Sequence, residues 1–236
     1  MAAGPMNSSE QIFRILKTEI LNLTLKPGEA ISENQLCARF HVSRTPIRSV
    51  LQRLANAGLV NVVPYKGTYV TLLNFEDIQQ IIYMRIAVES MVIRDFMEVC
   101  TPILEEKLRY IIRKQTVLVQ EEHFEIAHFY ELDSQLHEVW FKAIQKDRLW
   151  KLIQRSQINY TRFRMLDIVA VQNFEQIIEE HRALFAIIQQ RDKQAVEPLI
   201  RKHLNGGIYR LQERIQTEFK CYFQQEEEKQ PIALRL

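Results

Sequence analysis

The chain has 236 residues, of which 47% are hydrophobic and 25% are charged, a balance that is typical of a folded globular protein and excludes the disordered and fibrous classes. No segment reaches the roughly 18 uninterrupted apolar residues of a membrane helix, and the N-terminal stretch MAAGPMNSSEQ lacks the basic start and apolar core of a secretory signal. We therefore expect a cytoplasmic protein with no membrane partner. The net charge of +2 divides unevenly, because residues 1–75 carry 8 basic and 4 acidic side chains, which favours a polyanion-binding module in this third of the chain.

The N-terminal third begins with two predicted helices. Apolar residues recur at helical spacing from Ile12 to Leu23, and the pattern stops at the turn signal Lys26–Gly28. Ser32, followed three residues later by Gln35, forms a capping-box pattern that predicts the start of a short second helix.

A third helix is predicted from about Arg44 to Ala57. Ser43 can cap this helix by accepting hydrogen bonds from its free amide groups. Pro46 is tolerated because the amides of the first turn have no helical partner to lose. The stretch VSRTPIRSVL is therefore compatible with a helix despite its proline.

A small hairpin is predicted after this helix. The β-branched runs Leu59–Val63 and Thr68–Thr71 flank the glycine-containing turn Pro64–Gly67. Helix, turn, helix and hairpin in this order predict a winged helix-turn-helix, whose third helix enters the major groove of DNA. An ordinary surface helix with solvated arginines is the alternative, but the adjoining capped helix and the hairpin favour DNA binding.

Basic and small polar residues mark the surface that would contact DNA. Arginine can donate two hydrogen bonds to one guanine, and a lysine on a slim turn can approach a groove or a phosphate. The predicted DNA-binding residues are Ser43, Arg44, Thr45 and Arg48 at the third helix, and Lys66 and Gly67 at the hairpin tip.

From Asn74 onward the pattern is helical almost throughout. Helices are predicted from Asn74 or Asp77 to about Val99, from Thr101-Pro102, and over 123–145, 147–167, 173–190 and 192–220. These lengths allow an antiparallel bundle of about six helices. The expected fold is therefore mainly α, with a winged helix-turn-helix domain at 1–73 and an all-α antiparallel helical bundle at 74–236.

One aspartate and three histidines of this region could bind a metal ion. Asp133 and His137 are four residues apart and share a helix face, while His181 and His203 belong to later helices. Such a set suits zinc as the first choice, with nickel, manganese or iron as alternatives. Isolated surface or core histidines are the alternative interpretation, and we expect His123 and His128 to be surface residues of this kind.

Both regions resemble a known family. The N-terminal motifs are similar to the DNA-binding domain of GntR-family bacterial transcription regulators, and the C-terminal motifs to the FCD domain of the FadR-type branch of that family. The first set is Leu25–Gly28, Val42–Arg48, Leu54, Gly58–Val60 and Gly67–Val70; the second is Arg85–Glu89, Asp133–His137, Glu180–Leu184, Ala186-Ile187, Asp192, Ala195 and His203-Leu204.

The resemblance implies a function for the C-terminal domain. Asp133, His137, His181 and His203 would be the metal ligands, and Arg85 would be a cation that lines an effector cavity next to the metal. An ion pair between Arg85 and Glu89 is the structural alternative. Asn159 is expected to line the same cavity.

The expected partners follow from this picture. A small carboxylate could coordinate the metal while an arginine neutralises its remaining charge. A homodimer would read a palindromic double-stranded operator with two winged domains. The effector would change their orientation through the linker 72–76.

Two rival functions remain at this point. A metal-dependent enzyme could use the same aspartate and histidines. Such an enzyme also needs a positioned acid or base, and no motif supplies one. We therefore predict that the chain is not an enzyme. A helical interaction module whose winged domain does not read DNA would leave the two arginines without a purpose.

Overall fold

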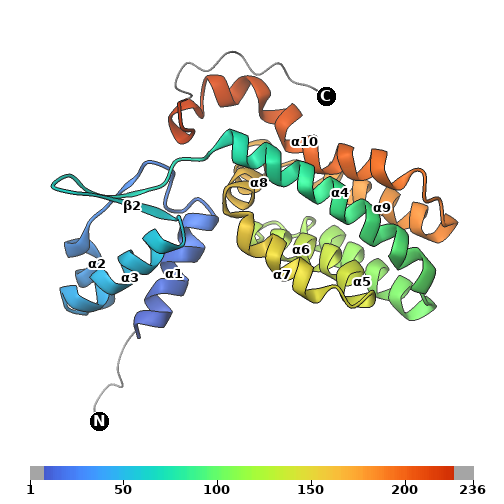
Figure 1. Cartoon of the computed structure of the whole chain (residues 1–236), viewed down its shortest axis with the longest axis horizontal. Helices are drawn as coiled ribbons and strands as arrows, with labels where there is room; N and C mark the ends of the chain where they lie inside the picture. Colours follow the sequence, from blue (N-terminus) through green and yellow to red (C-terminus); the bar gives the residue numbers. More distant parts are fainter. Residues whose placement is uncertain (1–7, 226–236) are drawn as a thin grey trace, which may run out of the picture. The chain divides into compact units, whose positions relative to one another are not determined.

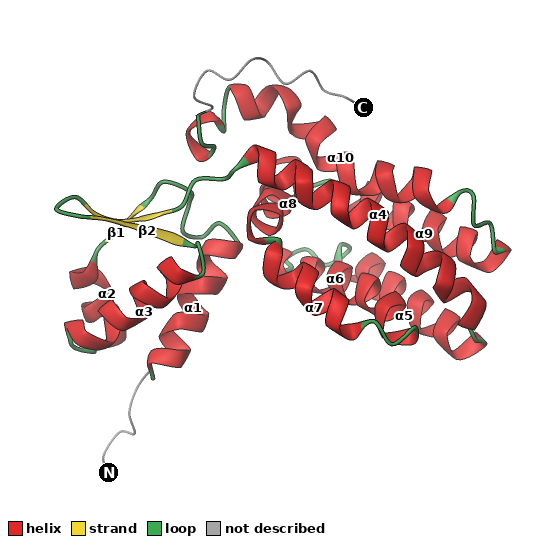
Figure 2. Cartoon of the chain, in the orientation of Figure 1, coloured by secondary structure: helices red, strands yellow, loops and turns green. Residues whose placement is uncertain are grey.

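The computed structural model describes residues 8–225. The N-terminal stretch MAAGPMNSSEQ, for which no secretory signal is predicted, lies mostly outside the described residues. The chain forms two compact units, shown along the sequence in Figure 1 and by secondary structure in Figure 2. The first contains Thr24–Phe75, most of the preceding helix and the chain from Glu213; the second contains Glu76–Gln212.

The first unit is a winged helix-turn-helix, as predicted. Its three strands are antiparallel and lie in the order β1-β3-β2, with Ala30 opposite Tyr69 and Val63 opposite Gly67. The two-residue strand β1 was not predicted, because alternation cannot be seen in so short a segment. The elements are α1 Ser9–Leu21, β1 Ala30–Ile31, α2 Glu33–Phe40, α3 Arg44–Asn56, β2 Val60–Val63 and β3 Gly67–Val70.

Helix α3 combines a buried and an exposed face. Its apolar positions pack into the core, while the arginine face points to solvent. The side chain of Ser32 accepts a hydrogen bond from the Gln35 amide, as the capping box predicted. Ser43 stands at the N-cap of α3 but makes no side-chain cap hydrogen bond. The prediction that its side chain caps the helix is wrong: the position is extended backbone, as a cap requires, but the exposed hydroxyl does not accept from the helix amides.

Residues 220–224 join the first unit next to the predicted linker. The Leu73 amide donates to the Tyr222 carbonyl at 2.8 Å, and the Gln224 amide donates to the Leu73 carbonyl at 2.9 Å. Phe223 is buried and meets the Phe75 ring edge to face. The short 3-10 helix η1, Lys220–Tyr222, precedes this bridge. Residues separated by most of the chain therefore share one small core.

The second unit is an all-α domain whose helices are drawn in Figure 2. No helix among the described residues is both long and apolar enough to cross a membrane. The helices are α4 Phe75–Val99, α5 Pro102–Leu118, α6 Ile126–Ala143, α7 Asp147–Ser156, α8 Ile158–Val171, α9 Phe174–Gln190 and α10 Val196–Gln216.

The prediction of one helix over 147–167 is wrong, because the chain forms α7 and α8 there. The two helices meet at Gln157, which is 1% exposed and leaves helical geometry with a ψ of 29°. Its carbonyl accepts the Thr161 amide at 2.7 Å and so starts the new helix. The break lets α8 bury its central stretch from Arg162 to Ile168, which includes Arg164. Neither proline nor glycine marks this position, so local sequence gives no signal.

Candidate functional site

The predicted metal ligands lie together inside the helical unit. Helix α6 supplies Asp133 and His137, α9 supplies His181, and α10 supplies His203. Each side chain offers one ligand atom, and these atoms all lie within 4.8 Å of one another. None of the four is more than 6% exposed. The structure therefore brings together four residues that are spread over 71 positions of sequence.

A second layer of side chains orients the imidazole rings. The Nδ1 atom of each histidine faces a side-chain oxygen on another helix: Glu89 for His137 at 2.6 Å, Gln115 for His181 at 2.9 Å, and Glu180 for His203 at 2.8 Å. An Nδ1–H that donates to such an oxygen leaves the lone pair on Nε2. This is the arrangement that metal-binding histidines usually have.

The Nε2 atoms of the three histidines converge at the Asp133 carboxylate. His203 Nε2 lies 3.3 Å from His137 Nε2, and His181 Nε2 lies 3.3 Å from the Asp133 Oδ1 atom. Although that carboxylate is near, His181 Nε2 is buried and has no well-formed hydrogen bond among the described residues. A buried nitrogen lone pair without a donor is costly, and a metal ion at this position would satisfy it. The donor set of three imidazoles and one carboxylate fits a divalent transition metal.

The protonation states also suit a metal ion. Burial lowers the pKa of His203 to about 4, although its hydrogen bond to Glu180 opposes the shift. Burial likewise lowers the pKa of His181. Burial opposes ionisation of Asp133, but the Arg164 charge and the His181 ring outweigh it and hold the pKa of Asp133 well below its usual range. At neutral pH His181 and His203 are thus neutral and Asp133 is ionised, the forms that bind metals.

Arg85 lies next to this cluster and is 4% exposed. Its Nε donates to Glu89 Oε1 at 2.5 Å, and its Nη2 lies 3.4 Å from His137 Nδ1. The ion pair that the spacing of four residues suggested is therefore present. Because Glu89 also holds His137, Arg85 is connected to a predicted ligand through one carboxylate.

Several residues of the site were missed by the sequence analysis. Arg164 Nη2 donates to Asp133 Oδ1 at 3.1 Å, while its Nη1 is buried without a hydrogen-bond partner among the described residues. Glu180 is the neighbour of His181 in sequence but orients His203 instead. Gln115 comes from α5, on which no metal-binding pattern exists, so only the fold could identify it.

Asn159 lies on α8, where it connects two other residues. Its Nδ2 donates to Asp77 Oδ2 at 2.7 Å, and its Oδ1 accepts from Arg162 Nη2 at 2.8 Å. Burial lowers the pKa of Arg162 to about 10. These contacts place Asn159 in a polar group between α4 and α8.

The predicted DNA-binding residues of α3 are exposed, and two of them contact α2. Thr45 is exposed, as are both arginines. Arg44 Nη2 donates to Asn34 Oδ1 at 3.1 Å, and Arg48 Nε lies 3.1 Å from Glu33 Oε2. The Arg48 and Glu33 side chains are 65% and 34% exposed. Such an exposed pair contributes little stability, so the arginine can exchange it for a phosphate or a base at small cost.

The predicted wing tip is a tight turn that presents a missed aromatic residue. Lys66 and Gly67 lie at the turn between β2 and β3, where Gly67 has a φ of 130°. Tyr65 stands beside them with its side chain fully exposed and a φ of 63°. The Tyr69 hydroxyl donates to the Lys66 carbonyl at 3.1 Å and so stiffens the turn. The wing tip therefore exposes a cation, Lys66, and an aromatic ring, Tyr65, to a binding partner.

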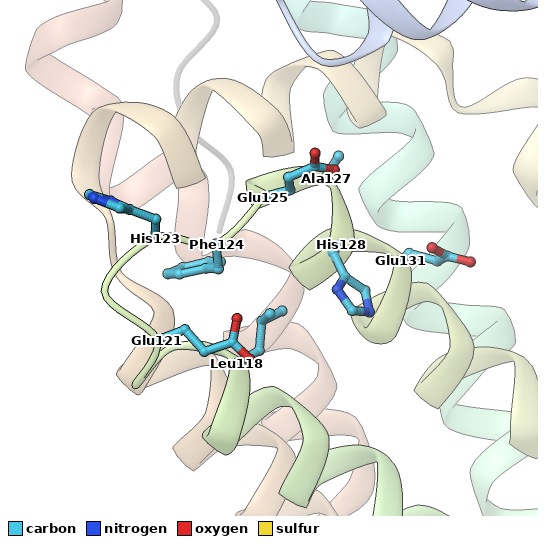
Figure 3. A pocket seen from close by; sticks show the side chains of 8 residues that line it. All are labelled: Leu118, Glu121, His123, Phe124, Glu125, Ala127, His128 and Glu131. Atoms are coloured by element: carbon cyan, nitrogen blue, oxygen red, sulfur yellow. The ribbon is translucent and has the colours of Figure 1, made fainter.

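Two surface pockets lie away from the metal-binding cluster. One has a volume of about 430 Å³ and is shown in Figure 3; the other, of about 380 Å³, lies on α5 and α9. His123 and His128 line the first pocket and are exposed, in line with their expected surface position. Pocket volume therefore does not identify the metal-binding cluster, because that cluster is buried inside the helical unit. The lining of the first pocket is Leu118, Glu121, His123, Phe124, Glu125, Ala127, His128 and Glu131.

The chain combines a winged helix-turn-helix that exposes arginines with an all-α domain that surrounds a buried polar cluster. This combination defines a DNA-binding transcription regulator. The chain belongs to the GntR family and carries an FCD domain: residues 8–70 match the family of bacterial regulatory proteins, gntR family, and residues 80–206 match the FCD domain. The related proteins are transcription regulators and not enzymes, so the enzyme alternative falls and the prediction of a non-enzyme is confirmed.

Curated relatives cover most of the chain. The HTH-type transcriptional repressor RspR of Escherichia coli (strain K12) is 28% identical over 222 residues, which are 94% of this chain and 95% of that protein. The uncharacterized HTH-type transcriptional regulator YdhC of Bacillus subtilis (strain 168) is 29% identical over 204 residues, 85% of this chain and 89% of that protein. Among solved structures, E. coli McbR/YncC has a TM-score of 0.68 at 19% identity and covers 89% of this chain and 99% of its own, a likeness of fold.

Proposed function

We propose that this regulator binds a palindromic double-stranded operator as a homodimer, and that a metal ion and a small carboxylate in the helical unit control its affinity for DNA. The exposed arginines of α3 and the wing tip support the DNA-binding part. In this proposal Arg44, Thr45 and Arg48 reach base edges, Ser43 and the N-terminal amides of α3 approach a phosphate, and Lys66 with Gly67 enters the minor groove. The protein would act in the cytoplasm.

The convergence of three Nε2 atoms and Asp133 Oδ1 is the observation that carries the metal part of the proposal. Asp133, His137, His181 and His203 would hold the ion, with zinc as the first choice and nickel, manganese or iron as alternatives. A bound ion would supply a Lewis-acidic centre for an oxygen ligand. The protein itself supplies the fixed ring orientations and the low polarity around them.

The charge of the site favours an anionic effector. Asp133, Glu89 and Glu180 contribute three negative charges, and Arg85 and Arg164 contribute two positive ones. A divalent ion would turn this excess of one negative charge into an excess of one positive charge. A carboxylate would neutralise it, and buried charges need such compensation.

The buried arginines would fix the orientation of this carboxylate. Arg164 Nη1 is a buried donor that lies 3.9 Å from Asp167 Oδ2 but makes no hydrogen bond among the described residues, so an acid oxygen would satisfy it. Arg85 and Asn159 are proposed as further effector contacts. The effector can shift DNA binding only by the difference of its affinities for the two arrangements of the winged units.

The first experiment measures metal content of the purified protein together with thermal stabilisation by a panel of small carboxylates, before and after chelation. We expect about one divalent ion per chain and stabilisation by one class of acid that disappears with the metal. Protein that holds no metal and responds to no acid would contradict the sensing proposal. Operator binding is tested separately by a salt titration, because phosphate contacts release counterions and the affinity should fall steeply with salt.

A further inference from the structure

A row of four charged side chains runs from the metal-binding cluster to helix α10. Asp133 accepts a hydrogen bond from Arg164 Nη2 at 3.1 Å, and Arg164 Nη1 lies 3.9 Å from Asp167 Oδ2. Asp167 in turn accepts two hydrogen bonds from Arg210, from Nε at 2.9 Å and from Nη2 at 2.6 Å. The charges alternate in sign along these four residues, which we call the charge row, and they connect α6, α8 and α10.

The charge row is almost completely removed from water. Asp167 is 0% exposed and Arg164 is 2% exposed, while the side chain of Arg210 is 13% exposed. Charges in such surroundings interact strongly, because little water screens them. A change of charge at one end of the row therefore alters the balance of the neighbouring pairs.

Two adjacent glycines of α10 make room for the last pair of the charge row. A Cβ atom on Gly206 would lie 2.7 Å from Arg210 Nη1, and a Cβ atom on Gly207 would lie 3.1 Å from Asp167 Oδ2. Glycine inside a helix is less stable than alanine, so two glycines in the middle of α10 call for a compensating role. The close approach of Arg210 and Asp167 to the α10 backbone provides that role.

Arg210 lies on the part of α10 that leads to the winged unit. The boundary between the two compact units falls between Gln212 and Glu213, inside α10, which continues to Gln216. A few residues later the chain forms the hydrogen bonds with Leu73 that are described above. A continuous helix is a rigid element that can carry a displacement along the chain.

We propose that Asp167 and Arg210 link the occupancy of the metal-binding cluster to the end of α10. The inference rests on the proposed function, because it names the residues through which a bound ion would reach the chain that leads to the winged unit. Neither residue belongs to the four predicted metal ligands. Both are positioning residues, since together they fix α10 to α8.

The link works because Arg164 faces two carboxylates. Its contact with Asp133 is a hydrogen bond, whereas 3.9 Å is too long for a hydrogen bond to Asp167, so both oxygens of Asp167 serve Arg210. When Asp133 coordinates a divalent ion, Arg164 faces less negative charge on that side and is repelled by the ion. Arg164 then depends more on Asp167, and Arg210 has to share this carboxylate. The attachment of α10 at Arg210 is thereby weakened.

The test uses the full-length protein with Zn²⁺ alone as the probe. Calorimetry measures zinc binding, and hydrogen exchange with mass spectrometry measures the opening of peptides within residues 208–216. In the wild-type protein, bound zinc should speed the exchange of these peptides at least about 5-fold, because the attachment of Arg210 is weakened.

Gly206→Ala breaks the link and leaves the predicted metal ligands in place. The new methyl group displaces the Arg210 guanidinium, which is the end of a flexible side chain. Zinc affinity should stay within about 3-fold of wild type, whereas residues 208–216 should exchange fast with and without zinc. Arg210→Lys is the second variant, because it keeps the charge but cannot donate two fixed hydrogen bonds to one carboxylate, and it should lose most of the zinc response.

Arg201→Ala is the matched control. It also removes an arginine that pairs with a carboxylate on α10, but the pair with Glu197 is exposed, at 51% and 35% for the two side chains. Its zinc response should equal that of wild type. Loss of the response in this control would count against the charge row, because the exposed pair is not part of it.

The remaining outcomes separate this inference from the proposed function. A Gly206→Ala protein that keeps the zinc response would overturn the link. A wild-type protein that binds zinc but shows equal or slower exchange at 208–216 would also overturn it, and the metal site of the proposed function would stand. A wild-type protein that binds no zinc would overturn both this inference and zinc as the ion of the proposed function.

Discussion

The two units use the same kind of ion pair in opposite ways. Arg48 and Glu33 pair on the surface of the winged unit with side chains 65% and 34% exposed, whereas Arg85 and Glu89 pair inside the helical unit with side chains 5% and 0% exposed. Water screens the first pair, so its charges remain available to a polyanion. The second pair is desolvated, so each charge depends on the other. The same two residue types therefore give charges that are available to a ligand when the pair is exposed, and charges that depend on each other when the pair is buried.

The largest effect is expected when the buried pair is broken. Glu89→Ala would leave the Arg85 charge without compensation and release the His137 ring, so the free energy of unfolding should fall by about 3–5 kcal/mol. Urea unfolding measures this loss, and Glu33→Ala is the matched variant at the exposed pair. A similar loss of stability in Glu89→Ala and Glu33→Ala would contradict the difference between the buried and the exposed pair.

The next effect concerns the metal ion. An ion present at 100 times its dissociation constant would stabilise the folded chain by about 2.7 kcal/mol, and His181→Ala should remove most of this gain together with the bound metal. Thermal unfolding with and without added zinc measures it. His128→Ala, at an exposed histidine of the same unit, should behave as wild type. Equal responses of the two variants would refute the ligand assignment.

A third effect tests the exposed face of α3. Arg48→Ala should weaken operator binding by about 1–3 kcal/mol and relax preference at one base position, while protein stability stays within about 1 kcal/mol of wild type. Fluorescence anisotropy with an operator duplex and its single-base variants measures both quantities. Arg14, which is exposed on α1 and paired with Glu10, provides the control substitution Arg14→Ala, for which operator affinity should not change.

The smallest effect sharpens the comparison at the surface pair itself. Glu33→Gln removes a negative charge that lies 3.1 Å from the Arg48 side chain, so the stability should change by less than about 1 kcal/mol. Operator affinity should rise slightly, because a carboxylate near the phosphates is lost and the arginine is released. Weaker binding in this variant would mean that Glu33 orients Arg48 for DNA.

The sequence predicted the parts of the molecule that depend on local patterns. The cap at Ser32, the helix that starts at Arg44 and the shared face of Asp133 and His137 follow from spacings of three or four residues, which a helix converts directly into geometry. The break at Gln157 did not follow, because it serves the burial of α8 and not a local preference.

The rest of the site depends on long-range packing. Gln115 lies 66 residues from the histidine that it orients, and no periodicity connects such positions. Glu180 was close to a predicted ligand in sequence, yet it serves a different one, since neighbouring helical residues point in different directions. The two arginines of α3 were visible as an exposed face, but their partners on α2 became known only with the fold.

The bridge between Leu73 and residues 222–224 has a consequence for synthesis. Asn74 hydrogen-bonds to Gln224, 150 residues further along, and Phe223 covers the core beside Leu73. Domains usually fold in the order in which the ribosome produces them, but the winged unit can bury this part of its core only after translation has passed Phe223. A product that stops before this segment would lack the Phe223 contacts with Leu73 and Phe75, so these two residues would be more exposed to solvent.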